Sequence, residues 1–161
     1  MRLLQLVLLA AACTSCISLS VGGSKTKKSD KVKYLAPNKD FTSTTVESAD
    51  AAWINKKRGT TISYQSACEE STEPSLDTIV GNAITDINEK EVLESTNFIF
   101  NDRKAFRSKV SGTVDGIPVH LDLVAFKKNG CSYLLTYVSL REHFNKDLNQ
   151  FEKFVRSFKA E

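Results

Sequence analysis

Three consecutive stretches with a two-residue repeat, joined by two tight turns, constrain the fold of this chain most strongly. Residues 106–114 and 117–125 alternate small or apolar side chains with polar ones, and Asp115-Gly116 stands between them. An Asp-Gly pair between two such runs is the strongest short-range signal for a β-hairpin. Lys128-Asn129-Gly130 predicts a second turn, followed by a strand over 131–139. Because this strand is apolar on both faces, we expect it at the centre of an antiparallel sheet.

The remaining patterns add further strands and two helices. Residues 51–54 and 60–66 flank a turn that ends in Gly59 and predict another hairpin, and residues 97–101 predict a short strand. Apolar residues at helical spacing over 75–87 and 144–158 predict two amphipathic helices. We therefore expect an α+β fold, in which an antiparallel sheet of five or six strands packs with two helices. A chain of 161 residues that is 41% hydrophobic and 25% charged fits one such domain, which we place at 34–161.

The first residues have the pattern of an export signal. One arginine is followed by an apolar run over 3–12, which is too short to cross a bilayer, and then by small residues around Cys13 and Cys16. Small residues before a cysteine resemble the lipobox of bacterial lipoproteins, in which that cysteine is acylated. We predict a signal peptide over 1–15 and lipidation of Cys16, with Cys13 as the alternative. Cutting before Cys16 removes Cys13 and leaves Cys68 and Cys131 as an even pair beside the lipidated cysteine, whereas cutting before Cys13 leaves an odd thiol at Cys16. An ordinary secretory signal without a lipid remains open.

Residues 16–33 predict a flexible basic tether. This segment is polar, contains glycine and serine, and holds a group of lysines from Lys25 to Lys33. These lysines are either a solvated spacer or a patch for anionic headgroups or a wall polymer. Ile17, rather than aspartate, follows Cys16. In a Gram-negative cell that choice favours the outer membrane.

Two cysteines remain in the expected domain. Cys68 follows one predicted strand and Cys131 begins another. Because an exported protein meets oxidising conditions and both residues lie near strand ends, a disulfide between them is expected. Two separately buried thiols are the competing interpretation.

The sequence contains little that indicates catalysis. Only His120 and His143 are histidines, and His120 stands two residues from Asp122 in a predicted strand. These two, with Tyr133, are weak candidates for a ligand or acid/base site, although a polar strand face explains them as well. His143 is expected at the surface. No cofactor or metal is expected, and a net charge of +3 in an exported chain argues against nucleic acid as a partner.

A combination of features resembles the PsbP-like family. These features are a hairpin that contains Trp53, a helix start at Ser75-Leu76, the meander over 104–139, and a final helix that ends in Phe154-Val155-Arg156-Ser157-Phe158. The resemblance covers about residues 40–160. It implies the family's fold and a role as an accessory or assembly module, and it provides no catalytic residues.

The sequence thus predicts a lipid-anchored accessory or binding module of the cell envelope, without catalytic activity, whose partners are the membrane and another envelope protein. A periplasmic hydrolase or small-ligand-binding protein with a site near His120 and Asp122 is the alternative. An exposed patch for a protein partner is expected near residues 98–107, with Trp53 and Tyr64.

Overall fold

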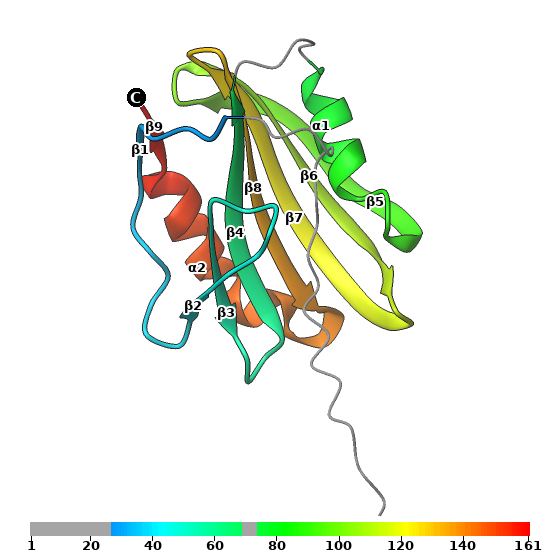
Figure 1. Ribbon diagram of the computed structural model, residues 1–161. Helices are drawn as coiled ribbons and strands as arrows, with labels where there is room; N and C mark the ends of the chain where they lie inside the picture. Colours follow the sequence, from blue (N-terminus) through cyan, green and yellow to red (C-terminus); the bar gives the residue numbers. More distant parts are fainter. Residues whose placement is uncertain (1–26, 69–73) are drawn as a thin grey trace, which may run out of the picture.

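A seven-stranded antiparallel sheet organises the protein (Figure 1). The computed structural model describes residues 27–68 and 74–161. The strand order is β2-β3-β4-β8-β7-β6-β5. In chain order, the elements of the main sheet are β2 (Thr42–Thr44), β3 (Ala51–Asn55), β4 (Thr60–Cys68), β5 (Asn88–Phe100), β6 (Arg103–Val114), β7 (Ile117–Lys128) and β8 (Cys131–Leu140). The helices are α1 (Leu76–Ala83), the 3-10 turn η1 (Arg141–His143) and α2 (Phe144–Ser157), and a small second sheet pairs β1 (Val32–Lys33) with β9 (Lys159–Ala160).

Three two-residue turns connect the four strands from β5 to β8. Both central residues have positive φ in each turn: Asn101 and Asp102, Asp115 and Gly116, Asn129 and Gly130. This is the geometry of the type I′ turn, whose twist matches that of the flanking strands. The predicted turns at 115 and 129 are confirmed. The turn at 101 was not predicted.

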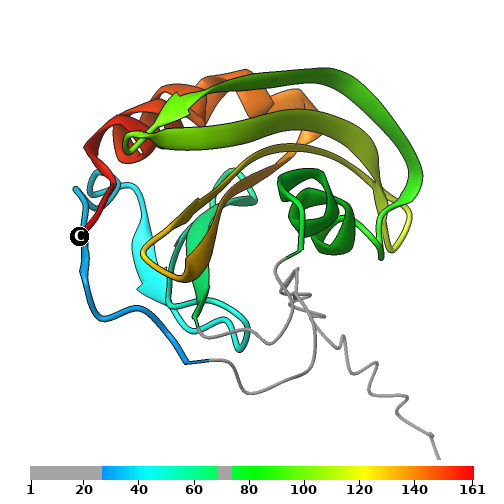
Figure 2. The ribbon, with the colours of Figure 1, turned by 90° about the horizontal axis from the view of Figure 1, so that it is seen from above.

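The two helices cover opposite faces of the sheet. Along β7, Val119, Leu121 and Leu123 belong to the cluster that includes α1, whereas Val124 and Phe126 belong to the cluster that includes α2. Figure 2 shows the sheet bending around α1, with α2 on its outer side. The alternation of side chains along a strand therefore gives β7 an apolar surface on both faces.

The predicted helices and their packing are confirmed. Ser75 caps α1 by accepting a hydrogen bond from the backbone N–H of Thr78 at 3.4 Å. The aromatic residues of α2 dock on the sheet, with Phe151 fully buried. The central position of β8 is confirmed as well, because it lies between β4 and β7. No helix in residues 27–68 and 74–161 is long and apolar enough to cross a membrane.

The structure differs from the sequence-based expectation in its strands. The sheet has seven strands rather than five or six, and β5 is 13 residues long instead of the predicted 97–101.

Trp53 and Tyr64, which were expected in an exposed patch, are buried at 9% and 5% exposure, so they form no such patch. Both rings pack around Tyr34 in the core under α2.

Residues 27–33, which we name the N-terminal strap, lie against the domain. The carbonyl of Lys27 accepts a hydrogen bond from the backbone N–H of Cys68 at 2.9 Å, and the backbone N–H of Ser29 donates to Ser66 Oγ at 2.8 Å. Further along, Val32 and Lys33 form β1 and pair with β9. The expected tether over 16–33 is therefore corrected from residue 27 onwards, because these backbone groups find partners on the sheet. The predicted signal peptide, Cys13, Cys16 and the rest of the tether lie outside the described residues.

Candidate functional site

Among the described residues, the most exposed regular element is the edge strand β5. Every residue from 88 to 97 is exposed, and only Phe98 and Phe100 are half-buried. Large apolar side chains are among the exposed ones: Val92 is 56% exposed, Leu93 50% and Ile99 72%. An edge strand offers unpaired backbone groups to another chain, and proteins usually shorten or cover such edges.

The first half of β5 carries features that oppose strand addition. Its pairing with β6 is interrupted between Asn88 and Glu91 and again between Val92 and Glu94. Bulges of this kind twist an edge away from regular pairing. Glu94 also forms an ion pair with Lys109 at 2.7 Å, which lowers the pKa of the Glu94 carboxyl. This half is therefore both irregular and charged.

The second half of β5 is regular and, beyond Glu94, uncharged. From Glu94 to Phe100 each residue pairs in sequence with β6. In a two-residue hairpin the residues that flank the turn, here Phe100 and Arg103, exchange hydrogen bonds, and hydrogen-bonded pairs then alternate along the ladder. The backbone N–H and C=O groups of Ser95, Asn97 and Ile99 consequently point away from β6, towards the open edge.

This half is also held firmly in place. The ring of Phe100 packs edge-on against Phe126 at 5.0 Å and lies 5.9 Å from Phe98. The turn that follows is tied to the C-terminal residues, because Asn101 Nδ2 donates to the carbonyl of Phe158 at 3.0 Å and Asn101 Oδ1 accepts from the N–H of Ala160 at 2.9 Å. A rigid edge loses little conformational entropy when it binds.

Asp122, one of the sequence candidates, belongs to a buried ion-pair network. Its side chain is fully buried, and Arg107 donates to both carboxylate oxygens, at 2.7 and 2.6 Å. Arg107 also binds Glu152 of α2 and lies over the ring of Phe151 at 5.9 Å. Burial raises the pKa of Asp122, while the guanidinium opposes that rise. With both oxygens engaged, this carboxylate joins the sheet to α2 and presents no open site.

The other two candidates lie elsewhere. The ring of His120 packs edge-on against Phe144 at 5.3 Å, and burial followed by repulsion from Arg141 lowers the pKa of its imidazole. Tyr133 pairs with Phe126, four positions along β7 from Asp122, and its buried hydroxyl donates to Ser29 Oγ at 3.0 Å. The structure therefore does not bring Tyr133 together with His120 and Asp122.

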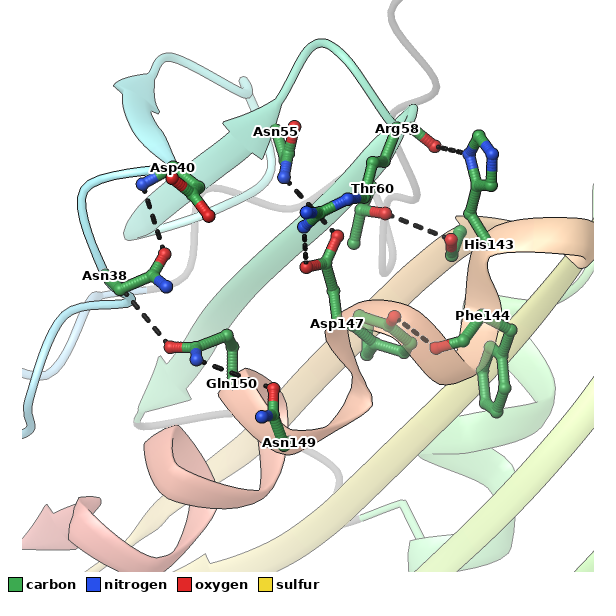
Figure 3. Close-up of polar contacts among 12 residues, drawn as sticks. Asn38, Asp40, Asn55, Arg58, Thr60, His143, Phe144, Asp147, Asn149 and Gln150 are labelled. Atoms are coloured by element: carbon green, nitrogen blue, oxygen red, sulfur yellow. Dashed lines mark hydrogen bonds and ion pairs between the residues drawn. The ribbon is translucent and has the colours of Figure 1, made fainter.

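A second polar cluster joins the β3–β4 turn to the start of α2 (Figure 3). Asp147 is buried and accepts from Arg58 Nη1 at 2.5 Å and from Asn55 Nδ2 at 3.4 Å. His143 was expected at the surface, but its side chain is only 21% exposed and its Nδ1 lies 2.9 Å from the carbonyl of Arg58. This cluster too is structural, because its charged groups are paired with one another.

One shallow pocket lies on the α1 face of the sheet. It is lined by Thr61, Ser63 and Gln65 of β4, Thr136 and Val138 of β8, and the loop residues Val46, Ser48 and Ala49. Its volume of about 20 Å³ has room for roughly one water molecule. It includes none of the three sequence candidates. Within residues 27–68 and 74–161, no three His, Cys, Asp or Glu side chains gather in a way that could hold a metal ion.

Cys68 and Cys131 form a disulfide between β4 and β8, at directly opposite positions with Cα atoms 4.0 Å apart. Residue 131 follows a type I′ turn, so its backbone N–H and C=O groups exchange hydrogen bonds with Lys128 of β7. Its pair with Cys68 of β4 is therefore a non-hydrogen-bonded pair. In an antiparallel ladder, non-hydrogen-bonded pairs have a shorter Cα–Cα distance than hydrogen-bonded pairs. The backbone N–H of Cys68 points away from β8 and donates to the carbonyl of Lys27.

Comparison with known proteins identifies the fold. No protein-family model matches the sequence, and a search of curated proteins finds no match. The cyanobacterial PsbP protein (CyanoP) of Synechocystis sp. is similar in structure, with a TM-score of 0.57 at 11% identity over 88% of this chain and 98% of that one.

Two further solved structures are similar. LpqN of Mycobacterium tuberculosis, a protein involved in cell envelope biogenesis, has a TM-score of 0.57 at 10% identity over 85% of this chain and 86% of that one. PA94 of Pseudomonas aeruginosa, a protein of unknown function, has a TM-score of 0.51 at 10% identity over 82% and 83%. The two-helix antiparallel architecture predicted from the sequence is thereby confirmed, and the chain has the PsbP-like fold.

Proposed function

We propose that this protein is a lipid-anchored, non-catalytic binding module of the cell envelope, and that the regular half of β5, residues 94–100, accepts an extended segment of an envelope protein. The exposed edge is the observation that carries the proposal. Partner recognition at an edge proceeds by strand addition, in which backbone hydrogen bonds supply affinity and side-chain contacts supply specificity.

The uncharged side chains and aromatic rings of residues 95–100 favour an uncharged, apolar segment as the occupant of this edge. Ser95, Asn97 and Ile99 face the α1 side and carry no charge, while Phe98 and Phe100 offer half-buried rings on the other side. A segment paired here would cover Ile99, which is 72% exposed. Burial of such a side chain stabilises a complex by roughly 2 kcal/mol.

Two observations support the envelope part of the proposal. The N-terminal sequence has the pattern of a lipoprotein signal, and the similar structures include LpqN, which is involved in cell envelope biogenesis. The non-catalytic part is supported by the pairing of Asp122 and Asp147 with arginines, since a paired buried carboxylate is not available as a general base.

Lipidation is tested by the intact mass of the protein isolated from membranes. We expect a chain that begins at Cys16 and carries acyl groups, with thiol alkylation at Cys68 and Cys131 only after reduction. A soluble product without acyl groups would overturn the anchor.

The edge is tested by a photoreactive residue at Asn97, whose backbone faces the open side. In intact cells we expect a discrete cross-linked product, which is lost in Ile99→Lys. The matched control is Ile117→Lys, because Ile117 is also an exposed apolar residue (41%) but lies in the β6–β7 hairpin, at the other end of the sheet. A product that persists in Ile99→Lys, or one whose mass is that of two copies of this chain, would contradict the proposal.

A further inference from the structure

A row of alternating charges crosses the sheet and ends at its open edge. Asp122 of β7 stands directly opposite Lys109 of β6, and Lys109 stands directly opposite Glu94 of β5. Residues that stand opposite one another share a face of the sheet, so all three side chains lie on the α2 face. We name these three residues the charge row. Because β5 is the last strand of the sheet, the row ends in a carboxylate (Figure 1).

Ion pairs connect the charge row to α2 and leave the connected group with one negative charge in excess. Arg107 binds both Asp122 and Glu152, and Asp122 accepts from it with both oxygens, as an ionised carboxylate does. The group therefore contains three carboxylates, on Glu94, Asp122 and Glu152, and two cations, on Lys109 and Arg107. Glu94 is its most exposed side chain at 58%. An external cation can thus approach the excess charge most closely at Glu94.

The carboxylate of Glu94 has room for a second cation on the side that faces the open edge. Lys109 approaches from the β6 side, where its ammonium lies 2.7 Å from Glu94 Oε2. Its hydrogen bond and its charge lower the pKa of the Glu94 carboxyl, which keeps that group ionised. A carboxylate offers about four lone-pair sites, so one lysine does not saturate it. A strand added to β5 would bring its own side chains to the other side of Glu94.

Glu94 also stands where regular pairing begins, so it can fix the register of an added strand. The ladder with β6 is interrupted between Val92 and Glu94 and is continuous from there to Phe100. Since the backbone groups of Ser95 point to the open edge, Glu94 would form a pair without backbone hydrogen bonds there, and such pairs bring side chains close together. Opposite charges at directly opposite positions stabilise a strand pair. A shift by one residue would turn the cation to the other face.

On the basis of the proposed function, we propose that the segment bound to residues 94–100 carries a lysine or arginine directly opposite Glu94, and that this pair sets its register. An antiparallel segment exchanges two hydrogen bonds with each outward-facing residue of β5, and antiparallel pairing is the more stable per residue. Such a segment runs from Phe100 towards Glu94, so its basic residue lies at the C-terminal end. The partner is therefore an extended, uncharged and apolar segment that ends in a basic residue.

The test selects phage-displayed random peptides on the purified full-length protein. Peptides that bind the edge are those that Ile99→Lys no longer retains. We expect these peptides to share an apolar run followed by Lys or Arg. Selection on Glu94→Lys should instead return Asp or Glu at that position. The matched control is Glu89→Lys, which makes the same change in the irregular half of β5 and should return the same peptides as the parent protein.

The affinity of one selected peptide, measured by fluorescence anisotropy, tests the pair directly. Replacing its basic residue with glutamine should weaken binding about threefold, as should Glu94→Gln, and the two changes together should cost no more than either alone. Glu94→Lys should weaken binding about tenfold, and a glutamate in the peptide should restore it. A role of Glu94 that is confined to holding Lys109 would not produce this restoration. Circular dichroism verifies that each variant is folded.

The outcomes separate the basic residue from the edge itself. Edge-dependent peptides without a preferred charge opposite Glu94, or losses that add in the combined variant, would overturn the inference, as would a selection that returns no edge-dependent peptide. If the cross-link at Asn97 forms in cells but the selection fails in one of these ways, only the inference falls. If the selection succeeds but no cross-link forms in cells, the pair with Glu94 stands while the cellular role of the edge falls.

Discussion

Asp122 shows how a single residue can look functional in a sequence and be structural in the fold. Its carboxylate is fully buried and held by Arg107, whose side chain is 19% exposed. Removing one partner of such a pair leaves the other charge poorly solvated. We expect Asp122→Ala to lower the free energy of unfolding by about 3 kcal/mol, measured by urea denaturation.

The matched control is Arg107→Met/Asp122→Leu, which replaces both charges with apolar side chains. This double variant should recover most of the loss, because a buried ion pair and a well-packed apolar pair often contribute similarly. A cost below about 1 kcal/mol for Asp122→Ala would show that the pair is dispensable.

His120 provides a second prediction at the residue scale, based on pH. Burial, and then repulsion by Arg141, lowers the pKa of its imidazole from 6.5 in the folded protein. Below about pH 6.5 the unfolded chain therefore binds a proton that the folded chain does not, and stability falls as the pH falls through that window. We expect the urea midpoint to decrease from pH 7.5 to 5, and His120→Gln to reduce that decrease. An identical pH dependence in the variant would assign it to other groups.

Among the secondary-structure elements, two glycines have opposite roles. Gly112 of β6 lies under the link from α1 to β5, where an added Cβ would lie 2.3 Å from Ile87 Cγ2 and 2.7 Å from the carbonyl of Asn88. Gly112→Ala should destabilise the protein by about 2 kcal/mol, since the backbone of residue 88 must shift. A Cβ added at Gly81 of α1 would meet no atom of another element within 4 Å, so Gly81→Ala should stabilise the protein by about 1 kcal/mol. Thermal unfolding of both variants tests the pair, and effects of the same sign would contradict it.

The strands differ in how well the sequence predicts them, and burial explains the difference. β7 and β8 are buried on one or both faces, so their side chains alternate or run apolar. β5 is exposed on both faces, and nothing in its composition requires alternation. The charges at Glu89, Glu91 and Glu94 therefore indicate a loop or helix surface rather than a strand. The exposed edge, which is the candidate site, becomes visible only when its partner β6 is placed beside it.

The same reasoning applies to the side chains that sequence analysis selected. His120 and Asp122 were correctly placed on one strand face, opposite the aliphatic residues that face α1. Phe144, Arg107 and Glu152 cover this face, and they are distant from it in sequence. Contacts between α2 and the sheet cannot be read from the local pattern of either element.

At the scale of the whole molecule, the disulfide and the contacts of both ends of the described chain lie at the same end of the sheet. The disulfide joins β4 to β8 there, the N-terminal strap pairs with β4 beside it, and β9 holds the strap to the C-terminus. The opposite end consists of turns that are held by side-chain contacts such as Arg58 with Asp147. A pull on the N-terminal strap would therefore be resisted first at the cross-linked end.

The disulfide supplies the last prediction. It joins residues 63 positions apart, and closing a loop of that length removes entropy worth about 4 kcal/mol from the unfolded chain. We expect Cys68→Ala/Cys131→Ala to lower the free energy of unfolding by about that amount in urea titrations. Reductant should lower the stability of the parent protein similarly and leave the double variant unchanged. The backbone N–H of Cys68, held by the Lys27 carbonyl, should exchange with solvent faster in the double variant than in the parent, because the strap then rests on a less constrained strand. A loss below about 1 kcal/mol would contradict this prediction and would mean that residual structure already restricts the unfolded chain nearly as much as the cross-link does.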